Sequence, residues 1–123
     1  MELLIDHRWL LAQQEVLLGK DLTVHDYSIF VGMGARHRVN TPRLGEEPDA
    51  SWRAAVLVEE LVLLRPLPAR NEYFAYGVAT AYLEASAQPI EAAYELWRDL
   101  ITDIRALRLD VYDIADRLRS WSI

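Results

Sequence analysis

Apolar residues along this chain recur every three or four positions, which is the spacing of one face of an α-helix, and no stretch alternates convincingly in the manner of a β-strand. The strongest segment is Ala50–Leu64, where this spacing is kept by Ala54, Leu57, Val58, Leu61 and Leu64. Val56, Val62 and Leu63 add apolar side chains around the rest of the same helix. A helix that is apolar nearly all round is typically buried, so we expect Ala50–Leu64 to be the central helix.

Residues that favour helix ends delimit the segments before this one. Asp6 is a good N-cap and Gly19 a good C-terminal residue, so the first helix is predicted to begin after Asp6 and to end at Gly19. The run Thr23–Asp26 is a variant of the capping box and predicts a second helix, which extends to about Val39. A loop marked by prolines and a glycine follows, and Asp49 at its end is expected to cap the central helix.

Three more helices are predicted after the central one. Apolar spacing predicts a helix over Phe74–Ala85 and a further one over about Glu91–Leu107. Asp110 and Asp113 form a box-like cap for a last helix, which is expected to end at about Trp121.

The six predicted helices indicate an all-α fold in which residues 1–123 form a single-domain six-helix bundle. Hydrophobic residues make up 52% of the chain and charged residues 26%, which is a normal globular balance. The net charge of −6 argues against general nucleic-acid binding, and the longest apolar run is too short to cross a membrane. Because the chain lacks cysteine and has acidic Glu2 and Asp6 near its start, we expect a cytoplasmic protein without a signal peptide.

The connector Arg65–Tyr73 is the stretch richest in candidate chemistry, and its sequence is Arg-Pro-Leu-Pro-Ala-Arg-Asn-Glu-Tyr. Its two prolines stop the central helix and stiffen the chain. Asn71 is well placed to cap the helix that follows. Since free backbone N–H groups at a helix start attract anions, the connector is a natural anion-binding segment.

The connector resembles the core signature of the Fic/Doc family, His-Pro-Phe-x-Asp/Glu-Gly/Ala-Asn-Gly/Lys-Arg. Pro66 and Asn71 match this signature. Three positions differ: Arg65 replaces the catalytic His, Ala69 replaces the metal-binding acid, and Tyr73 replaces the phosphate-binding Arg. The motif therefore resembles that of the family while lacking its main functional groups.

The likeness extends over Ala50–Trp121, whose helices are similar in order and length to those of small Doc-type toxins and of short proteins labelled as Fic-type toxin components in actinobacterial genomes. Members of the family use the His as a general base, the acid to hold magnesium and the Arg to neutralise phosphates, and they transfer AMP or a phosphoryl group. The replacements imply that orthodox transfer activity and its cofactor are lost. The resemblance then implies a toxin-type component that binds a small antitoxin, whose tail docks as a helix on apolar residues such as Trp9, Trp52 or Leu67.

An alternative hypothesis retains enzymatic chemistry in the same cleft. Side chains suited to an anion gather around the middle of the chain, and the candidates are Arg36, Arg38, Arg65, Arg70, Asn71 and Tyr73. His37 is the best remaining acid or base. Together they would bind and transform an anionic or phosphorylated small molecule. The competing interpretation is a set of surface arginines that pair with acids such as Glu59 and Glu60.

Two further sets of residues carry weaker signals. The three histidines, His7, His25 and His37, lack metal-ligand spacing, so no metal site is expected. The tyrosines near the connector either line a small-molecule pocket or pack in the core, and these are Tyr73, Tyr76 and Tyr82.

Overall fold

A computed structural model describes residues 3–19, 27–39 and 47–123, and the predicted all-α class is confirmed within these ranges. Apart from an isolated bridge between Ile90 and Ser122, the described backbone consists of helices and their connections. The helices are α1 (His7–Leu18), α2 (Tyr27–His37), α3 (Ala50–Leu64), α4 (Asn71–Ala85), α5 (Tyr94–Arg105) and α6 (Val111–Ser120).

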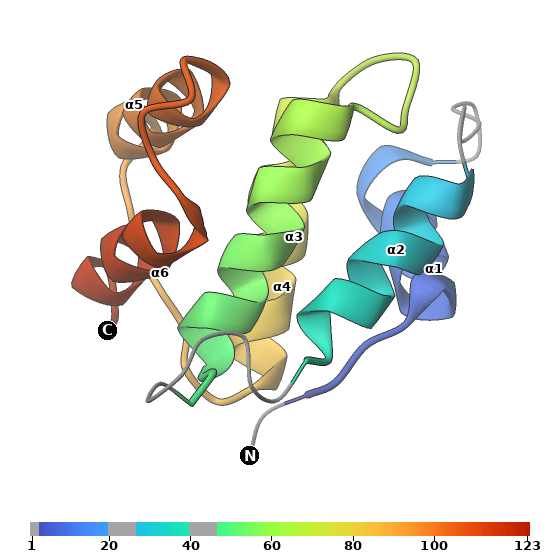
Figure 1. Cartoon of the computed structure of the whole chain (residues 1–123), viewed down its shortest axis with the longest axis horizontal. Helices are drawn as coiled ribbons and strands as arrows, with labels where there is room; N and C mark the ends of the chain where they lie inside the picture. Colours follow the sequence, from blue (N-terminus) through green and yellow to red (C-terminus); the bar gives the residue numbers. More distant parts are fainter. Residues whose placement is uncertain (1–2, 20–26, 40–46) are drawn as a thin grey trace.

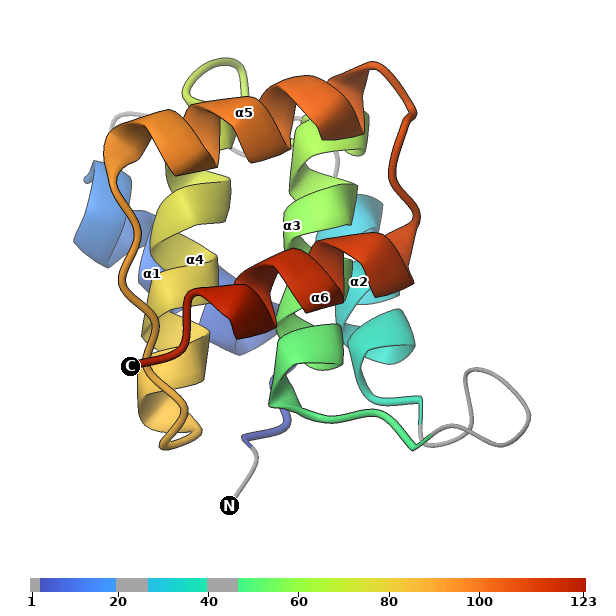
Figure 2. The same ribbon diagram turned by 90° about the vertical axis from the view of Figure 1, so that its left-hand side faces the viewer.

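The pair formed by α3 and α4 lies at the centre of the molecule, with α1 and α2 on one side and α5 and α6 on the other (Figure 1). α5 crosses the ends of α3 and α4 that lie nearest their connector, whereas α6 crosses the pair further along (Figure 2). α5 packs on α3 and α6, and α6 packs extensively on α3. The connector between α3 and α4 therefore lies at the same end of the molecule as α5.

α3 is buried along almost its whole length, as the sequence predicts for a central helix. Every side chain from Ala50 to Val58 is buried, and so are Leu61 and Val62. The helix packs against α2, α4, α5 and α6. Full burial of a Leu or Val side chain stabilises a fold by about 1.5–3 kcal/mol, so the remaining helices gain most by covering α3.

Arg53 is a charged residue inside this apolar helix, and it is only 4% exposed. Its Nη1 atom donates hydrogen bonds to the carbonyl oxygens of His37, at 2.6 Å, and Val39, at 3.1 Å. Carbonyls at a helix C-terminus have no partner within their own helix. The guanidinium of Arg53 therefore caps the end of α2 from α3.

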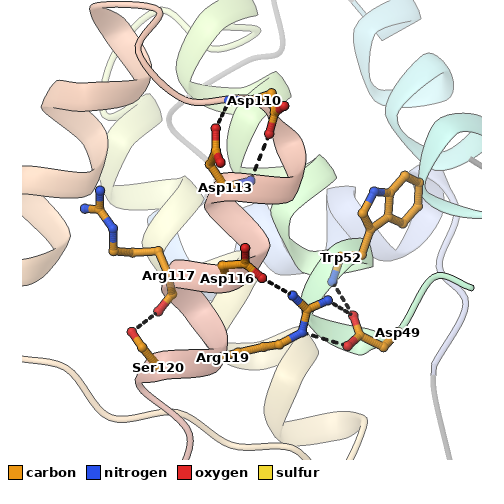
Figure 3. A network of polar contacts seen from close by, with 8 residues as sticks. All are labelled: Asp49, Trp52, Asp110, Asp113, Asp116, Arg117, Arg119 and Ser120. Carbon is orange, nitrogen blue, oxygen red and sulfur yellow. Dashed lines mark hydrogen bonds and ion pairs between the residues drawn. The ribbon is translucent and has the colours of Figure 1, made fainter. Parts of the chain in front are cut away.

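The predicted caps are confirmed at three helices. Asp6 accepts hydrogen bonds from the first turn of α1, and Gly19 ends the helix with φ 77°. Asp49 accepts a hydrogen bond from the backbone of α3. At α6, the side chains of Asp110 and Asp113 each accept from the other's backbone N–H, which forms a complete capping box (Figure 3).

Two predicted helix starts are wrong. α4 begins at Asn71 rather than Phe74, and its N-cap is Arg70, which adopts the left-handed conformation with φ 62°. Asn71 is therefore the first helical residue and not the cap. α5 begins at Tyr94 rather than Glu91, because the backbone N–H of Glu91 donates to the carbonyl of Trp121 and holds this segment extended.

Two predictions cannot be followed in the fold. The capping box Thr23–Asp26 lies outside the described residues, as do residues 40–46 of the predicted loop before Asp49. The second helix is described from Tyr27 and ends at His37, two residues before its predicted end.

A polar network joins the start of α3 to the end of α6 (Figure 3). One oxygen of Asp49 accepts from the backbone N–H of Trp52 at 2.8 Å. The same carboxylate accepts two hydrogen bonds from Arg119, each of 2.9 Å, and Arg119 also donates to Asp116. Asp49 is thus both a helix cap and one half of a two-pronged ion pair, so it ties two helices together.

We expect the substitution Asp49→Ala to lower the free energy of unfolding by about 1–2 kcal/mol, because it removes a helix cap and an exposed ion pair. Asp49→Asn keeps a good N-cap and should cost no more than about 1 kcal/mol. Asp116→Asn is the control, since Asp116 is 76% exposed and should change stability little. Urea unfolding monitored by circular dichroism measures all three, and equal stability of Asp49→Ala and the unmodified chain would contradict this account.

The same carboxylate makes stability depend on pH. Partial burial raises the pKa of Asp49, but the hydrogen bonds from Arg119 and from the Trp52 N–H outweigh it, so the pKa lies below its ordinary value. A lowered pKa in the folded state stabilises the fold fully above about pH 4, the ordinary range of Asp, and this contribution is lost as the pH falls further. The Asp49→Asn variant should therefore lose less stability than the unmodified chain below pH 4.

Candidate functional site

Asn71 holds the connector between α3 and α4 in shape. Its side-chain oxygen accepts from the N–H of Leu67 at 3.0 Å, and its side-chain nitrogen donates to the carbonyl of Leu67 at 2.9 Å. Asn71 is 1% exposed and Leu67 is 2% exposed. Both ends of the amide are thus engaged with the connector's own backbone, and the side chain faces the protein interior rather than solvent.

Arg65, the first residue of the connector, forms an ion pair with Glu72. Arg105 from α5 approaches the same carboxylate at 3.5 Å. Partial burial raises the pKa of Glu72, but the hydrogen bond from Arg65 and the charges of both arginines lower it by more. Glu72 is therefore ionised at neutral pH, and its charge is balanced from both sides.

The remaining candidate arginines have different neighbours. Arg70 lies over the ring of Tyr73, with its guanidinium carbon 4.8 Å from the ring centre. Arg36 pairs with Glu59 at 2.6 Å and Glu60 at 2.8 Å, as the competing interpretation predicts.

The two groups of arginines come from different parts of the bundle. Arg36 and Arg38 lie at the end of α2, which is beside the start of α3, whereas Arg65 and Arg70 follow the far end of α3 (Figure 1). The structure therefore brings Arg65 and Arg70 to one connector and does not join them to Arg36 and Arg38 in a single cluster.

His37 is fully buried, and both of its ring nitrogens have backbone partners. Nε2 accepts from the N–H of Ile5 at 3.2 Å, which puts the ring proton on Nδ1, 3.2 Å from the carbonyl of Arg53. Burial is the main cause that lowers the pKa of His37, and together with the smaller effect of the Arg53 charge it outweighs the backbone hydrogen bonds that raise it, so the pKa lies at about 4. A neutral, enclosed histidine with no free nitrogen gives no support to the predicted catalytic role.

A pocket of about 550 Å³ lies between α4 and α5, beside the connector. Four aromatic residues line it: Tyr73, Tyr76, Tyr94 and Trp97. Glu72, Arg98 and Arg105 bring charge to its wall. Since α5 packs mainly on α3 and α6, this space between α5 and α4 is left open to solvent.

Only part of this pocket is predicted from the sequence. Tyr73 and Tyr76 line it, whereas Tyr82 is buried elsewhere and donates its hydroxyl proton to the carbonyl of Leu3. The residues of α5 were missed, although their positions 94, 97, 98, 101 and 105 follow helical spacing along one face. That face reads as a mixture of aromatic, aliphatic and cationic side chains, which is the signal that could have identified it.

Two of the apolar residues named for partner docking are not available on the surface. Trp52 is 4% exposed and Leu67 is 2% exposed, so the prediction that they form an exposed docking face is wrong. The backbone N–H of Leu67 donates to the buried side chain of Asn71, which holds this residue toward the interior. Trp52 is buried together with the other residues in the first half of α3. Trp9 is half-buried against Tyr82.

The described residues contain neither a group of side chains suited to a metal ion nor a helix suited to cross a membrane. Within residues 3–19, 27–39 and 47–123, no three His, Cys, Asp or Glu side chains group so that they could hold a metal ion. In the same ranges, no helix has the length and apolar character needed to traverse a bilayer.

We expect the stability of the fold to fall as the pH is lowered from about 6.5 toward 4. The folded-state pKa of His37 is about 4, below the ordinary value of 6.5, so only the unfolded chain takes up a proton in this window. At about 1.4 kcal/mol per pKa unit, the loss amounts to roughly 3 kcal/mol at most. Urea unfolding across this pH range should show a shallower slope for His37→Gln, with His7→Gln as control. An unchanged slope in His37→Gln would contradict the buried, neutral state.

Comparison with known proteins adds no relative to this description. No protein-family model, no curated protein and no solved structure matches the chain.

Proposed function

We propose that this chain acts by binding another protein, as a Fic/Doc-like toxin-type component that has lost the residues for nucleotide-dependent transfer. The main support is the state of the connector, where the signature positions are either replaced or held by internal contacts. The side chain of Ala69 has no ligand atom for a metal. Both ends of the Asn71 side-chain amide are hydrogen-bonded to the backbone of Leu67.

A transferase of this kind needs a proton acceptor close to neutral pH and a clamp for phosphate. Arg65 has a guanidinium, which offers donors and no acceptor, and it is paired with Glu72, so it does not replace the base. Glu72 lies in the first turn of α4 and pairs with Arg65, so this arginine is engaged by a carboxylate of the chain itself and is not left as a clamp for phosphate. The connector therefore favours a role without transfer chemistry.

Exposed apolar side chains on α2 and α3 supply a surface for a protein partner. Tyr27 and Val31, one helical turn apart on α2, are each 47% exposed. Leu63 and Leu64 at the end of α3 are 40% and 49% exposed. Since α2 packs on α3, these residues suit an amphipathic helix, such as the tail of a small antitoxin, that buries its apolar face.

A second candidate function is a repurposed enzyme that acts on an anionic small molecule. The pocket beside Tyr73 favours a ligand at this end of the molecule. His37 does not line that pocket, and both of its nitrogens are engaged, so the acid or base that this enzyme needs is not available there. Protein binding is therefore the better-supported function.

We expect that incubation of the purified chain with radiolabelled ATP, magnesium and a bacterial lysate leaves every protein unlabelled. Both α- and γ-labelled ATP are used, so that transfer of AMP and of a phosphoryl group are each detected. The matched variant carries Arg65→His, Ala69→Asp and Tyr73→Arg, which restores the three replaced positions. Label transferred by the variant alone would support the lineage, whereas a labelled band with the unmodified chain would refute the loss of activity.

We also expect the chain to co-purify with the product of a short reading frame adjacent to its own gene. Val31→Glu together with Leu64→Glu should weaken this complex at least about tenfold, because burying an unpaired charge at an interface is costly. Val16→Glu, at a residue that is 77% exposed on α1, is the matched control. An undiminished complex in the double variant would exclude α2 and α3 as the docking surface.

A further inference from the structure

Beyond the proposed protein binding, and independently of it, we infer that the pocket between α4 and α5 binds a planar aromatic anion. The ligand class is a molecule of one or two fused rings that carries a carboxylate. The argument rests on the walls of the pocket, its charge and its unused polar groups.

Aromatic rings form the walls. Trp97 is 4% exposed, and its ring centre lies 4.9 Å from that of Tyr76 in an edge-to-face arrangement. The ring of Trp121 supports Trp97 from another direction, also at 4.9 Å. Tyr94 and Tyr73 complete the aromatic lining and are 70% and 48% exposed. A rigid aromatic wall beside exposed rings accommodates a flat ligand that stacks, with ring centres about 4.5–7 Å apart.

The charge of the lining selects an anion. Two arginines, Arg98 and Arg105, face one acid, Glu72, so the lining carries a formal excess of one positive charge. Glu72 is also paired with Arg65, which is not part of the lining, and its charge is thereby neutralised from outside the pocket. The whole chain has a net charge of −6, so this positive site stands out against an acidic molecule.

Both arginines keep donors for a ligand. Arg98 is 58% exposed and touches only Asp99 among the described acids, at a long 3.5 Å. Arg105 is 61% exposed and reaches Glu72 at 3.5 Å. A guanidinium has five N–H donors in a planar fork that matches a carboxylate, and these long contacts leave most of them unused.

The tyrosine hydroxyls add unused polar groups. Within the described residues, the hydroxyls of Tyr73, Tyr76 and Tyr94 have no hydrogen-bond partner. The volume of about 550 Å³ falls within the range of about 300–1,000 Å³ in which proteins hold small ligands. The pocket thus combines aromatic side chains with two guanidinium groups and three hydroxyls that lack a partner in the described part of the chain. This lining suits an aromatic acid better than a purely apolar molecule.

The test compares 2-naphthoate with its neutral isostere 2-naphthamide by isothermal titration calorimetry on the full chain. We expect the carboxylate to bind about tenfold more tightly than the amide, since a charge-assisted hydrogen bond is worth about this factor. Raising the salt concentration should weaken the binding of the carboxylate and leave the binding of the amide unchanged. Quenching of tryptophan fluorescence gives a second readout, because Trp97 lines the pocket.

Three variants assign the binding to this pocket. Arg98→Gln combined with Arg105→Gln should remove the preference for the carboxylate while binding of the amide persists. Tyr94→Ala, at an exposed residue whose loss spares the core, should weaken both compounds. Arg108→Gln is the control, because Arg108 is an exposed residue that pairs with Asp103 and does not line the pocket.

Several outcomes would overturn the inference. These are no binding of either compound, equal affinity for carboxylate and amide, and a preference that survives the double arginine variant. A dimer that dissociates on Tyr94→Ala, seen by analytical ultracentrifugation, would instead assign the pocket to contact with a second copy. None of these results bears on the partner docking proposed for α2 and α3, which uses other residues and a different measurement.

Discussion

The burial of α3 is the constraint on which the rest of the structure depends. A helix covered on nearly every side has no water available for its polar groups, so each of them needs a partner inside the protein. Arg53 shows the consequence: its charge is placed where the last carbonyls of α2 need donors. The position of α2 is fixed by the same contact, and His37 is thereby held beside the carbonyl of Arg53.

The same requirement explains the connector. Asn71 is itself buried at the start of α4 and meets its hydrogen-bonding needs through both backbone groups of Leu67. That contact fixes the shape of the six residues between α3 and α4 and draws Leu67 into the core. Asn71 therefore has a sufficient structural reason to be present, and its presence alone says little about chemistry.

Local signals in the sequence predicted much of the fold. Asp6, Asp49 and the Asp110–Asp113 box act within one helical turn, so their roles follow from neighbouring residues alone. The start of α4 was missed because the cap is Arg70 in a left-handed conformation, which residue preference does not anticipate. The start of α5 was missed because a long-range contact between Glu91 and Trp121 overrides local helix preference.

The candidate site required tertiary information for a similar reason. Each half of the pocket is visible as a helical stripe, but spacing within α5 cannot tell that Trp97 meets Tyr76. Spacing along the sequence also does not show that Arg65 and Arg105 approach the same carboxylate, that of Glu72.

Glu72 connects the connector with the pocket, and its position determines where an anion is attracted. In the first turn of α4, its carboxylate opposes anion binding by the helix N-terminus itself. Arg65 cancels much of that charge from the connector side, and Arg105 approaches it from α5. The positive potential that remains is therefore displaced from the backbone of the connector to the exposed guanidinium groups of α5. An anion drawn to this end of the molecule meets Arg98 and Arg105 beside aromatic rings, and not the N–H groups of a phosphate-binding loop.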